Sequence, residues 1–157
     1  MTKEAIRSRL RENLGDKVVA WYDKSETRAY VEVRPEDVPE VTRLIFKDLK
    51  ARFQIASGID TPSAIEILYH WAFDAVGLVV TVKTKLDRDH PEIESVATIC
   101  TGTEWIEREM WELLGITFRN HPDVRHLLLL DDWPEGAYPM RRDYIPPPRG
   151  EDAKTHG

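Results

Sequence analysis

Residues 64–86, AIEILYHWAFDAVGLVVTVKTKL, decide the fold. The first half places a large apolar side chain at every second position, namely Ile65, Ile67, Tyr69 and Trp71. Glu66 and His70 fall on the opposite side, a period of two that is typical of a strand with one buried face. Residues 77–86 are rich in β-branched side chains and form the strongest strand signal in the chain. The stretch FDAVG between the two predicts a tight link, so the segment indicates paired strands.

Upstream of this pair the pattern alternates between helix and strand. Residues 3–14 predict a short amphipathic helix, because apolar residues recur every four positions and Gly15 follows. Residues 17–22 and 28–33 are β-rich runs joined by the polar stretch DKSET, which predicts a hairpin. Pro35 fits the first turn of a second helix that runs to about Lys50. Its apolar face consists of Val38, Val41, Ile45 and Leu49, and residues 52–58 predict a further strand.

Downstream, residues 86–95 predict a polar loop and residues 96–100 a short extended piece. A third helix is expected from about Gly102, because Thr101 and Glu104 have the spacing of a capping box, and Gly115 fits a left-handed C-terminal cap. The element order is helix–two strands–helix–three strands–helix. This order predicts an α+β fold, a two-layer sandwich with a mixed sheet, as a globular domain over residues 1–120.

The third helix carries an unusual distribution of charge. Its apolar face, which should pack on the sheet, consists of Ile106, Met110, Leu113 and Leu114. A second row at i, i+4 spacing, which favours ion pairs, consists of Glu104, Arg108 and Glu112. Glu107 and Glu109 flank the apolar face, while Trp105 points to the charged side. Aromatic side chains interleaved with charges are typical of an interface; the alternative is a solvated helix with a partly covered Trp105.

The chain after residue 120 has a different composition. Six of the ten prolines lie between Pro122 and Pro148, so regular structure should be sparse beyond about residue 131. Residues 124–130 fit either a strand or a short helix. The region also carries large apolar side chains, namely Trp133, Tyr138, Met140, Tyr144 and Ile145. We therefore predict an extended docking segment over residues 121–157 that lies on a partner; the alternative is that it folds back on its own sheet.

Composition limits the function. The formal charge of −6 argues against nucleic acid as a partner. Cys100 is the only cysteine, which excludes an internal disulfide and any iron–sulfur cluster or thiolate zinc site built from this chain alone. The sequence shows no signal-peptide core and no apolar run of roughly 18 residues, so we expect no membrane span in this chain.

Catalysis is a weaker interpretation of the acidic helix. Glu107, Glu109 and Glu112 offer carboxylates for acid–base chemistry, but neighbours at i, i+2 diverge on a helix. His121 and His126 lie in a proline-bounded turn without a third metal ligand at a suitable spacing. The sequence therefore predicts no catalytic, cofactor-binding or metal-binding residues in this chain.

One run of residues carries a family resemblance. The pattern Glu107-Arg108-Glu109-x-x-Glu112-Leu-Leu-Gly, then His121-Pro122 and Arg125-x-Leu-Leu, resembles the signature of the 30-kDa subunit of respiratory complex I, which in bacteria is the C subunit of NADH-quinone oxidoreductase. Trp133, Pro139 and the run Arg141-Arg142-Asp143-Tyr144 resemble the end of the same family. With the sheet segments upstream, the resemblance covers most of residues 35–148.

The resemblance implies a scaffold subunit in the peripheral arm of a membrane-bound, ion-translocating redox complex, on the cytoplasmic side of the cell membrane. It implies no cofactor in this chain; iron–sulfur clusters, and flavin or nickel–iron, are expected in partner subunits. Those partners are a large subunit (49-kDa-like or hydrogenase large) and neighbouring iron–sulfur subunits. The expected interface residues are Trp105, Glu107, Arg108, Glu109, Trp111, Glu112, His121, Arg125, Trp133, Tyr138, Arg141, Arg142, Asp143 and Tyr144.

The chain departs from the quinone-reducing branch at three places. That branch usually has Asp where Glu112 stands, Arg where His126 stands, and Leu-Arg-Lys-Asp where this chain has Met140-Arg141-Arg142-Asp143. These departures favour the branch of the membrane-bound nickel–iron hydrogenases and of the archaeal dehydrogenases that use a deazaflavin or ferredoxin. Two other classes stay open at this point: a free-standing carboxylate enzyme, and an adaptor without a redox partner.

Overall fold

The computed structural model describes residues 1–147 of the chain. Its centre is a five-stranded mixed sheet in the order β1-β2-β5-β4-β3. The strands are β1 (Val18–Ser25), β2 (Arg28–Val33), β3 (Arg52–Asp60), β4 (Ile65–Phe73) and β5 (Leu78–Leu86). Only β2 and β5 pair in parallel; the other neighbours are antiparallel. The predicted α+β sandwich with a mixed sheet is confirmed.

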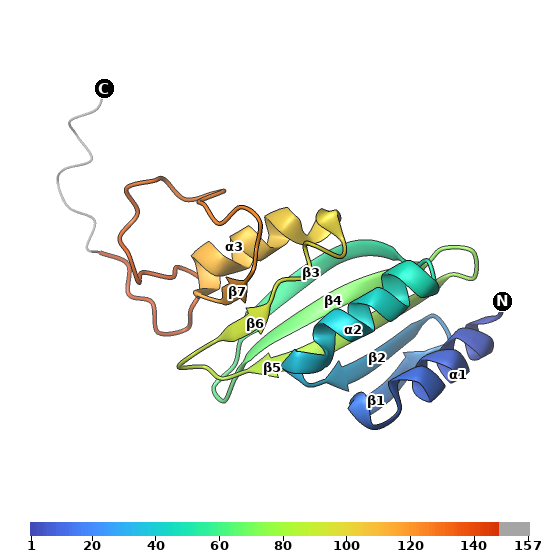
Figure 1. Ribbon diagram of the computed structural model, residues 1–157. Coiled ribbons are helices and arrows are strands. Elements are labelled where there is room, and N and C mark those ends of the chain that lie inside the picture. Colours follow the sequence, from blue (N-terminus) through green and yellow to red (C-terminus); the bar gives the residue numbers. More distant parts are fainter. Residues whose placement is uncertain (148–157) are drawn as a thin grey trace.

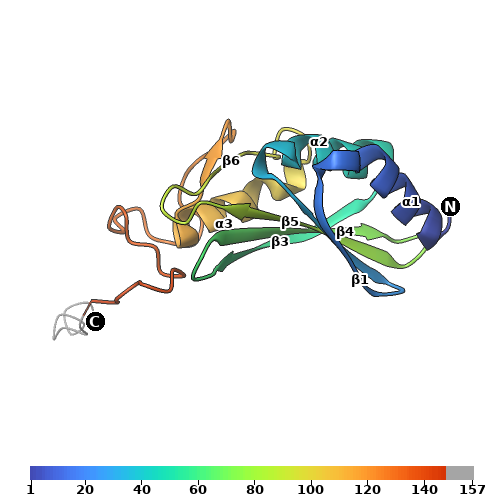
Figure 2. The same ribbon diagram turned by 90° about the horizontal axis from the view of Figure 1, so that it is seen from below.

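The helices lie on one face of this sheet and make the second layer (Figures 1 and 2). They are α1 (Lys3–Leu14), α2 (Val38–Thr42) and α3 (Glu104–Leu114), with short helical turns at η1 (Gly15–Lys17), η2 (Pro35–Asp37) and η4 (Thr101–Thr103). The α2 helix continues as a π-helix, η3 (Arg43–Asp48), so the predicted second helix exists but is regular α-helix over five residues only. Val38, Val41 and Ile45 are buried as expected.

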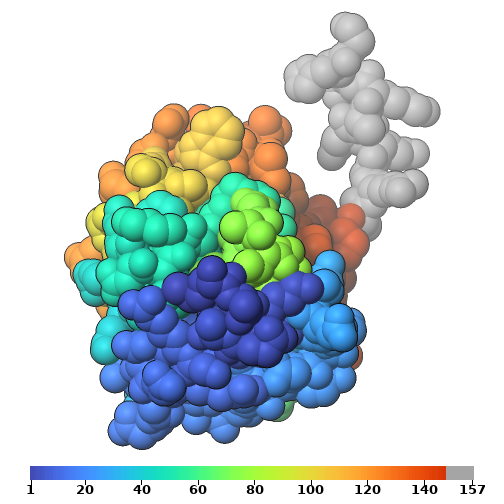
Figure 3. All heavy atoms as spheres, turned by 90° about the vertical axis from the view of Figure 1, so that its right-hand side faces the viewer, coloured from blue at the N-terminus to red at the C-terminus, as the bar shows by residue number. Residues whose placement is uncertain are grey.

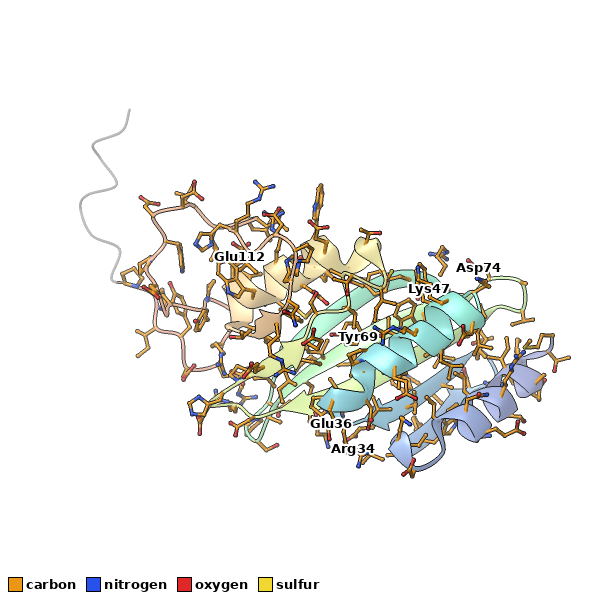
Figure 4. The ribbon with its side chains drawn as sticks, viewed as in Figure 1. Arg34, Glu36, Lys47, Tyr69, Asp74 and Glu112 are labelled. Carbon is orange, nitrogen blue, oxygen red and sulfur yellow. The ribbon has the colours of Figure 1, made fainter. Side chains whose placement is uncertain are left out.

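The alternation in β4 is confirmed. Ile65, Ile67, Tyr69 and Trp71 are all fully buried and face the helices. The two isoleucines contribute about 1.5–3 kcal/mol each when they leave water. Figure 4 shows Tyr69 between the sheet and α2. The Trp71 ring packs at 5.1 Å from that of Phe53, so the aromatic side chains of β3 and β4 anchor the middle of the core.

Two predictions about the connection before α3 are wrong. The polar loop over 86–95 contains a short strand, β6 (Glu92–Glu94), which pairs in parallel with β7 (Thr117–Arg119). Residues 96–100 are a turn and not extended, because the amides of Ile99 and Cys100 both donate to the carbonyl of Val96. The expected capping box is also absent among the described residues: the N-cap of α3 is Thr103, whose hydroxyl donates to the carbonyl of Cys100.

After β7 the chain runs beside α3 and then loops beyond the end of the sheet that is remote from the N-terminus (Figure 1). Viewed from the N-terminal end, α1 and the β1–β2 hairpin fill the lower part of the near face, and the orange atoms of this segment lie along the top (Figure 3). Residues 131–147 contain turns but no helix or strand, as the prolines predict. The last part of the predicted docking segment, residues 148–157, lies outside the described residues.

Candidate subunit interface

Helix α3 buries a carboxylate on its sheet-facing side. Glu107 is fully buried, and its two oxygens accept hydrogen bonds from the Ser95 hydroxyl and from the amide of Val96. Desolvation raises the pKa of Glu107 to about 7, although these two bonds act in the opposite direction. Burial, together with the nearby Glu107 carboxylate, also raises the pKa of Tyr69 well above its ordinary value. Glu107 therefore fixes the turn that enters α3.

His121 joins the same region from the C-terminal segment. Its Nδ1 accepts a hydrogen bond from the amide of Asp123, so the ring proton sits on Nε2, which donates to the carbonyl of Glu104 at 3.0 Å. The same Nε2 lies 3.8 Å from a carboxylate oxygen of Glu107. His121 thus ties the start of the C-terminal segment to the first turn of α3.

Arg108 continues this attachment one turn further along α3. Its side chain is almost completely buried, and the guanidinium donates to the carbonyls of Arg125 (3.0 Å) and His126 (2.8 Å). Both acceptors are backbone groups of the C-terminal segment. A guanidinium with several donors in a fixed fork suits this role, because it satisfies two adjacent carbonyls at once.

Glu112 completes the attachment at the end of the helix. Its carboxylate accepts hydrogen bonds from three successive amides, those of Leu127, Leu128 and Leu129, and from Nδ1 of His126 at 3.0 Å. Consecutive N–H groups that converge in this way form a concave site for an anion. Desolvation raises the pKa of Glu112, but the bonds from Leu128 and Leu127 outweigh it, so the pKa lies below its ordinary value. Figure 4 shows Glu112 on the side of α3 that faces the C-terminal segment.

The row formed by Glu104, Arg108 and Glu112 therefore has a different role from the predicted one. Within residues 1–147 these three side chains make no ion pairs with one another. Instead, the backbone carbonyl of Glu104 and the side chains of Arg108 and Glu112 each bind one part of residues 121–129. We call Arg108 and Glu112, with the backbone of 125–129 that they bind, the α3 clasp. It also explains why residues 124–130 form neither a strand nor a helix: their backbone groups bond to side chains.

A second attachment lies at the far end of the sheet. Asp60, at the end of β3, accepts two hydrogen bonds from the guanidinium of Arg88 and one from the amide of Arg142 at 2.8 Å. Desolvation raises the pKa of Asp60, but the Arg88 and Arg142 bonds outweigh it and hold the pKa below its ordinary value. Arg141 donates to the carbonyl of Arg88. Asp60 and Arg88 were not predicted; the signal available was a charged pair at the two strand ends.

Gly115, at the end of α3, contacts the C-terminal segment between the two attachments. Its left-handed conformation (φ 74°) ends α3 as predicted. A Cβ at this position would lie only 2.5 Å from the ring of Tyr138, so the glycine also lets that ring lie against the end of the helix. The amide of Met140 donates to the carbonyl of Leu113 at the same place. The segment thus returns to its own domain on both sides of the loop over 130–137.

Replacing Gly115 by alanine tests this contact. We expect Gly115→Ala to cost about 2–4 kcal/mol of unfolding free energy, because the left-handed backbone is strained and the Tyr138 ring must move. Gly77→Ala is a matched control: Gly77 has φ 62°, with nothing within 4 Å of a Cβ. We expect it to cost about 1–2 kcal/mol. Urea unfolding of both variants gives the difference, and equal losses would contradict a role for Tyr138.

Several expected interface residues present surface to solvent. Trp105 is 68% exposed, and Arg125, Arg142 and Asp143 are also exposed. The partly exposed members are Glu109, Trp111, Trp133, Tyr138, Arg141 and Tyr144, whereas the side chain of His121 is buried. Glu107, Arg108 and Glu112 lie inside the chain and hold its own backbone. The segment adds exposed apolar side chains at Leu128, Leu130, Met140 and Ile145.

Neither a cluster of metal ligands nor a membrane-spanning helix is found in residues 1–147. No group of three or more His, Cys, Asp or Glu side chains among residues 1–147 is placed to hold a metal ion. No helix in the same range is long and apolar enough to cross a bilayer. Glu107 and Glu109 do not meet at one point: Glu107 is fully buried under α3, whereas Glu109 is partly exposed.

Comparison with known sequences identifies the family. The sequence model described as "Respiratory-chain NADH dehydrogenase, 30 Kd subunit" matches residues 31–150. The chain belongs to this family.

Three relatives of the 30 Kd subunit family show how far the likeness extends. The chain is 44% identical over 90 residues to the C subunit of the F(420)H(2) dehydrogenase of Methanosarcina mazei, a match that covers 56% of each chain. It is 34% identical over 142 residues to the C subunit of the NADH-quinone oxidoreductase of Chlorobium phaeobacteroides, covering 86% of this chain and 84% of the relative. Against the corresponding C subunit of Salinispora tropica it spans about half of the relative's length (53%).

Solved structures share the fold of this 30 Kd family member. A chain of the membrane-bound sulfane sulfur reductase, described as an archaeal respiratory membrane complex, superposes with a TM-score of 0.79 at 23% identity and covers 90% of this chain and 85% of its own. Nqo5, as a trypsin-resistant fragment, gives a TM-score of 0.59 at 18% identity and covers 76% of this chain and 97% of its own. At these identities the likeness shows the fold alone.

Proposed function

We propose that this chain is a scaffold subunit in the peripheral arm of a membrane-bound, ion-translocating oxidoreductase of the complex I type, and that it supports the large subunit. One observation carries the proposal. The C-terminal segment is fastened to its own domain at the α3 clasp and at Asp60, yet it holds Leu128, Leu130 and Met140 exposed. Apolar side chains held on a fixed backbone are suited to contact with another protein.

The family supports the same proposal. Relatives named as the C/D subunit of NADH-quinone oxidoreductase carry two subunit letters in one chain, and the present chain matches 18% of one of them. A fusion of that kind is consistent with a subunit that stays permanently bound to a neighbouring subunit. We propose that iron–sulfur clusters, flavin or nickel–iron belong to the large and iron–sulfur subunits, and that the assembly sits on the cytoplasmic side of the membrane.

The branch of the family is a finer proposal. Glu112 and His126 depart from the pattern of the quinone-reducing branch, and in this chain they bond to each other at 3.0 Å. The 44% identity to a subunit of an F(420)H(2) dehydrogenase agrees with that departure. We propose a complex of the archaeal or hydrogenase-like kind, with the quinone-reducing kind as the alternative. Purification of the native complex, with identification of its subunits and metals, distinguishes them.

Truncation tests the docking role. A chain that ends at Leu130 keeps the α3 clasp. It lacks residues 131–157 and therefore loses the hydrogen bond from Arg142 to Asp60. We expect this 1–130 chain to fold, because the sheet and helices are complete, and to be lost from the purified complex. Tagged full-length and truncated chains, expressed in the native host and pulled down, give the yield of the large subunit.

A chain that ends at residue 147 is the matched control, because it is shortened but keeps the whole described segment. We expect it to assemble normally. Normal assembly of the 1–130 chain would contradict the docking role. Loss of assembly in both would place the contact in residues 148–157 and contradict the docking role of residues 131–147.

A further inference from the structure

A partly open cavity of about 400 Å³ lies between the loop over 130–138 and the C-terminal end of α3. Three aromatic residues line it: Trp111 from α3, and Trp133 and Tyr138 from the loop. Glu112 and His126 of the clasp region also line it, together with Pro134 and the exposed residues Asp131 and Glu135. We call this space the aromatic cavity. Its walls come from two parts of the chain that are distant in sequence.

The walls of the aromatic cavity are held in place by this chain alone. The indole N–H of Trp133 donates to the carbonyl of Ala137 at 2.7 Å, across a turn whose third residue is Gly136 with φ 76°. The Trp111 ring lies 5.2 Å from the His126 ring, which in turn bonds to Glu112. Because these rings are already ordered, an occupant does not have to order them on binding.

The charges around the aromatic cavity favour a cation. Glu112 already has its hydrogen bonds filled by the clasp. Asp131 and Glu135 make no ion pair within residues 1–147. The guanidinium of Arg141 lies 5.9 Å from the Tyr138 ring, and the charge of Arg125 interacts with that of Asp131, but neither arginine lines the cavity. Electron-rich aromatic rings next to carboxylates that form no ion pair are an environment that binds an ammonium or guanidinium group.

We propose that the aromatic cavity receives a cationic side chain, an arginine or a lysine, of the partner subunit on which the C-terminal segment docks. This inference rests on the proposed function for the identity of the partner, but the preference for a cation follows from the lining alone. An apolar side chain is the competing occupant, since indole and phenol rings also cover aliphatic groups. The two occupants differ in their dependence on charge, which a pair of small probes separates.

The experiment follows the indole N–H signals of the full-length chain by two-dimensional NMR during titration with arginine amide. Citrulline amide, which has nearly the same shape and no charge on its side chain, is the matched probe. We expect arginine amide to shift the Trp111 and Trp133 signals saturably, and citrulline amide at least about tenfold more weakly. Equal shifts from both probes, or none at these two signals, would overturn the proposal.

Variants locate the binding. Trp133→Leu should weaken arginine amide binding about tenfold, and Glu135→Gln, on an exposed turn, about threefold. Asp132→Asn removes a carboxylate from an exposed neighbour that does not line the cavity, so it should change the affinity less than about twofold. If Asp132→Asn and Glu135→Gln weaken binding equally, the effect is general charge and the proposed site is wrong.

The cavity proposal and the docking role can be refuted independently of each other. If the 1–130 chain is lost from the complex while arginine amide shows no charge-dependent binding, the cavity proposal fails and the docking role stands. If arginine amide binds selectively and the 1–130 chain still assembles, the docking role fails. In that case the cavity's choice of a cation stands, but its assignment to the docking partner is overturned.

Discussion

Replacing Glu112 by alanine is expected to cost about 3–5 kcal/mol of unfolding free energy. The carboxylate is the shared acceptor for the amides of Leu127, Leu128 and Leu129, and for His126. Alanine leaves these four donors without their acceptor, at a position where the wild-type side chain is buried. For a chain of this size the loss corresponds to a fall of about 10 °C in Tm.

Hydrogen exchange separates a local effect from a general one. In Glu112→Ala the amides of residues 127–129 should exchange quickly, while the amides of β4 and β5 lose protection only in proportion to the global stability. Glu109→Ala, a half-buried position on the same helix, should cost less than about 1 kcal/mol. A Glu112→Ala protein that unfolds at the same urea concentration as the wild type would refute the clasp as a source of stability.

Replacing Glu107 by glutamine is expected to stabilise the protein at neutral and alkaline pH. The pKa of Glu107 is raised from 4.5 to about 7, so the folded state binds a proton that the unfolded state has already released. The associated stability is complete below about pH 4.5 and is lost as the pH rises through 7. The full difference is about 3 kcal/mol at 1.36 kcal/mol per pH unit. Glutamine carries no charge, so it does not incur this loss.

The difference in unfolding free energy between Glu107→Gln and the wild type should depend on pH. The stability of Glu107→Gln minus that of the wild type should rise between about pH 4.5 and 7 and stay level above. Glutamine still accepts from the amide of Val96 and can donate to Ser95, so the local bonds are largely kept. Urea unfolding at several pH values, with Glu109→Gln to control for lost charge, gives the profile. A flat difference across this range would show that the buried carboxyl titrates normally.

Features that depend on neighbours in sequence were predicted best. The alternation over 65–71 identified the buried face of β4, and the four-residue spacing with Gly15 identified α1. Gly115 ended α3 as expected because only a residue without a side chain is comfortable in the left-handed region. The β6–β7 pair was missed because each strand is three residues long, too short for a period of two to be visible.

The candidate site was predicted only in part, because its bonds join distant residues. Spacing on the helix indicated ion pairs between Arg108 and its acidic neighbours, and this was wrong: the backbone of residues 125–129 offered Arg108 and Glu112 better partners. The four consecutive leucines, residues 127–130, carry no sequence pattern that indicates that the amides of residues 127–129 bind the Glu112 carboxylate. Helical spacing placed Glu107 beside the apolar face, but its burial required Ser95, twelve residues earlier, to lie across it.

The parallel pairing of β2 with β5 has a consequence for how the chain folds. All the other strand pairs of the large sheet join strands that are consecutive in sequence. In the β2–β5 pair, by contrast, Arg28 lies opposite Val79, which is far away in the sequence. Closing so long a loop carries the highest entropic cost in the sheet, and the second partner of β2 does not exist until β5 has been synthesised. The meander β3–β4–β5 can form from local contacts, and we expect the N-terminal hairpin with α1 to join its edge afterwards. We therefore expect residues 1–33 to be among the last to pack against the sheet.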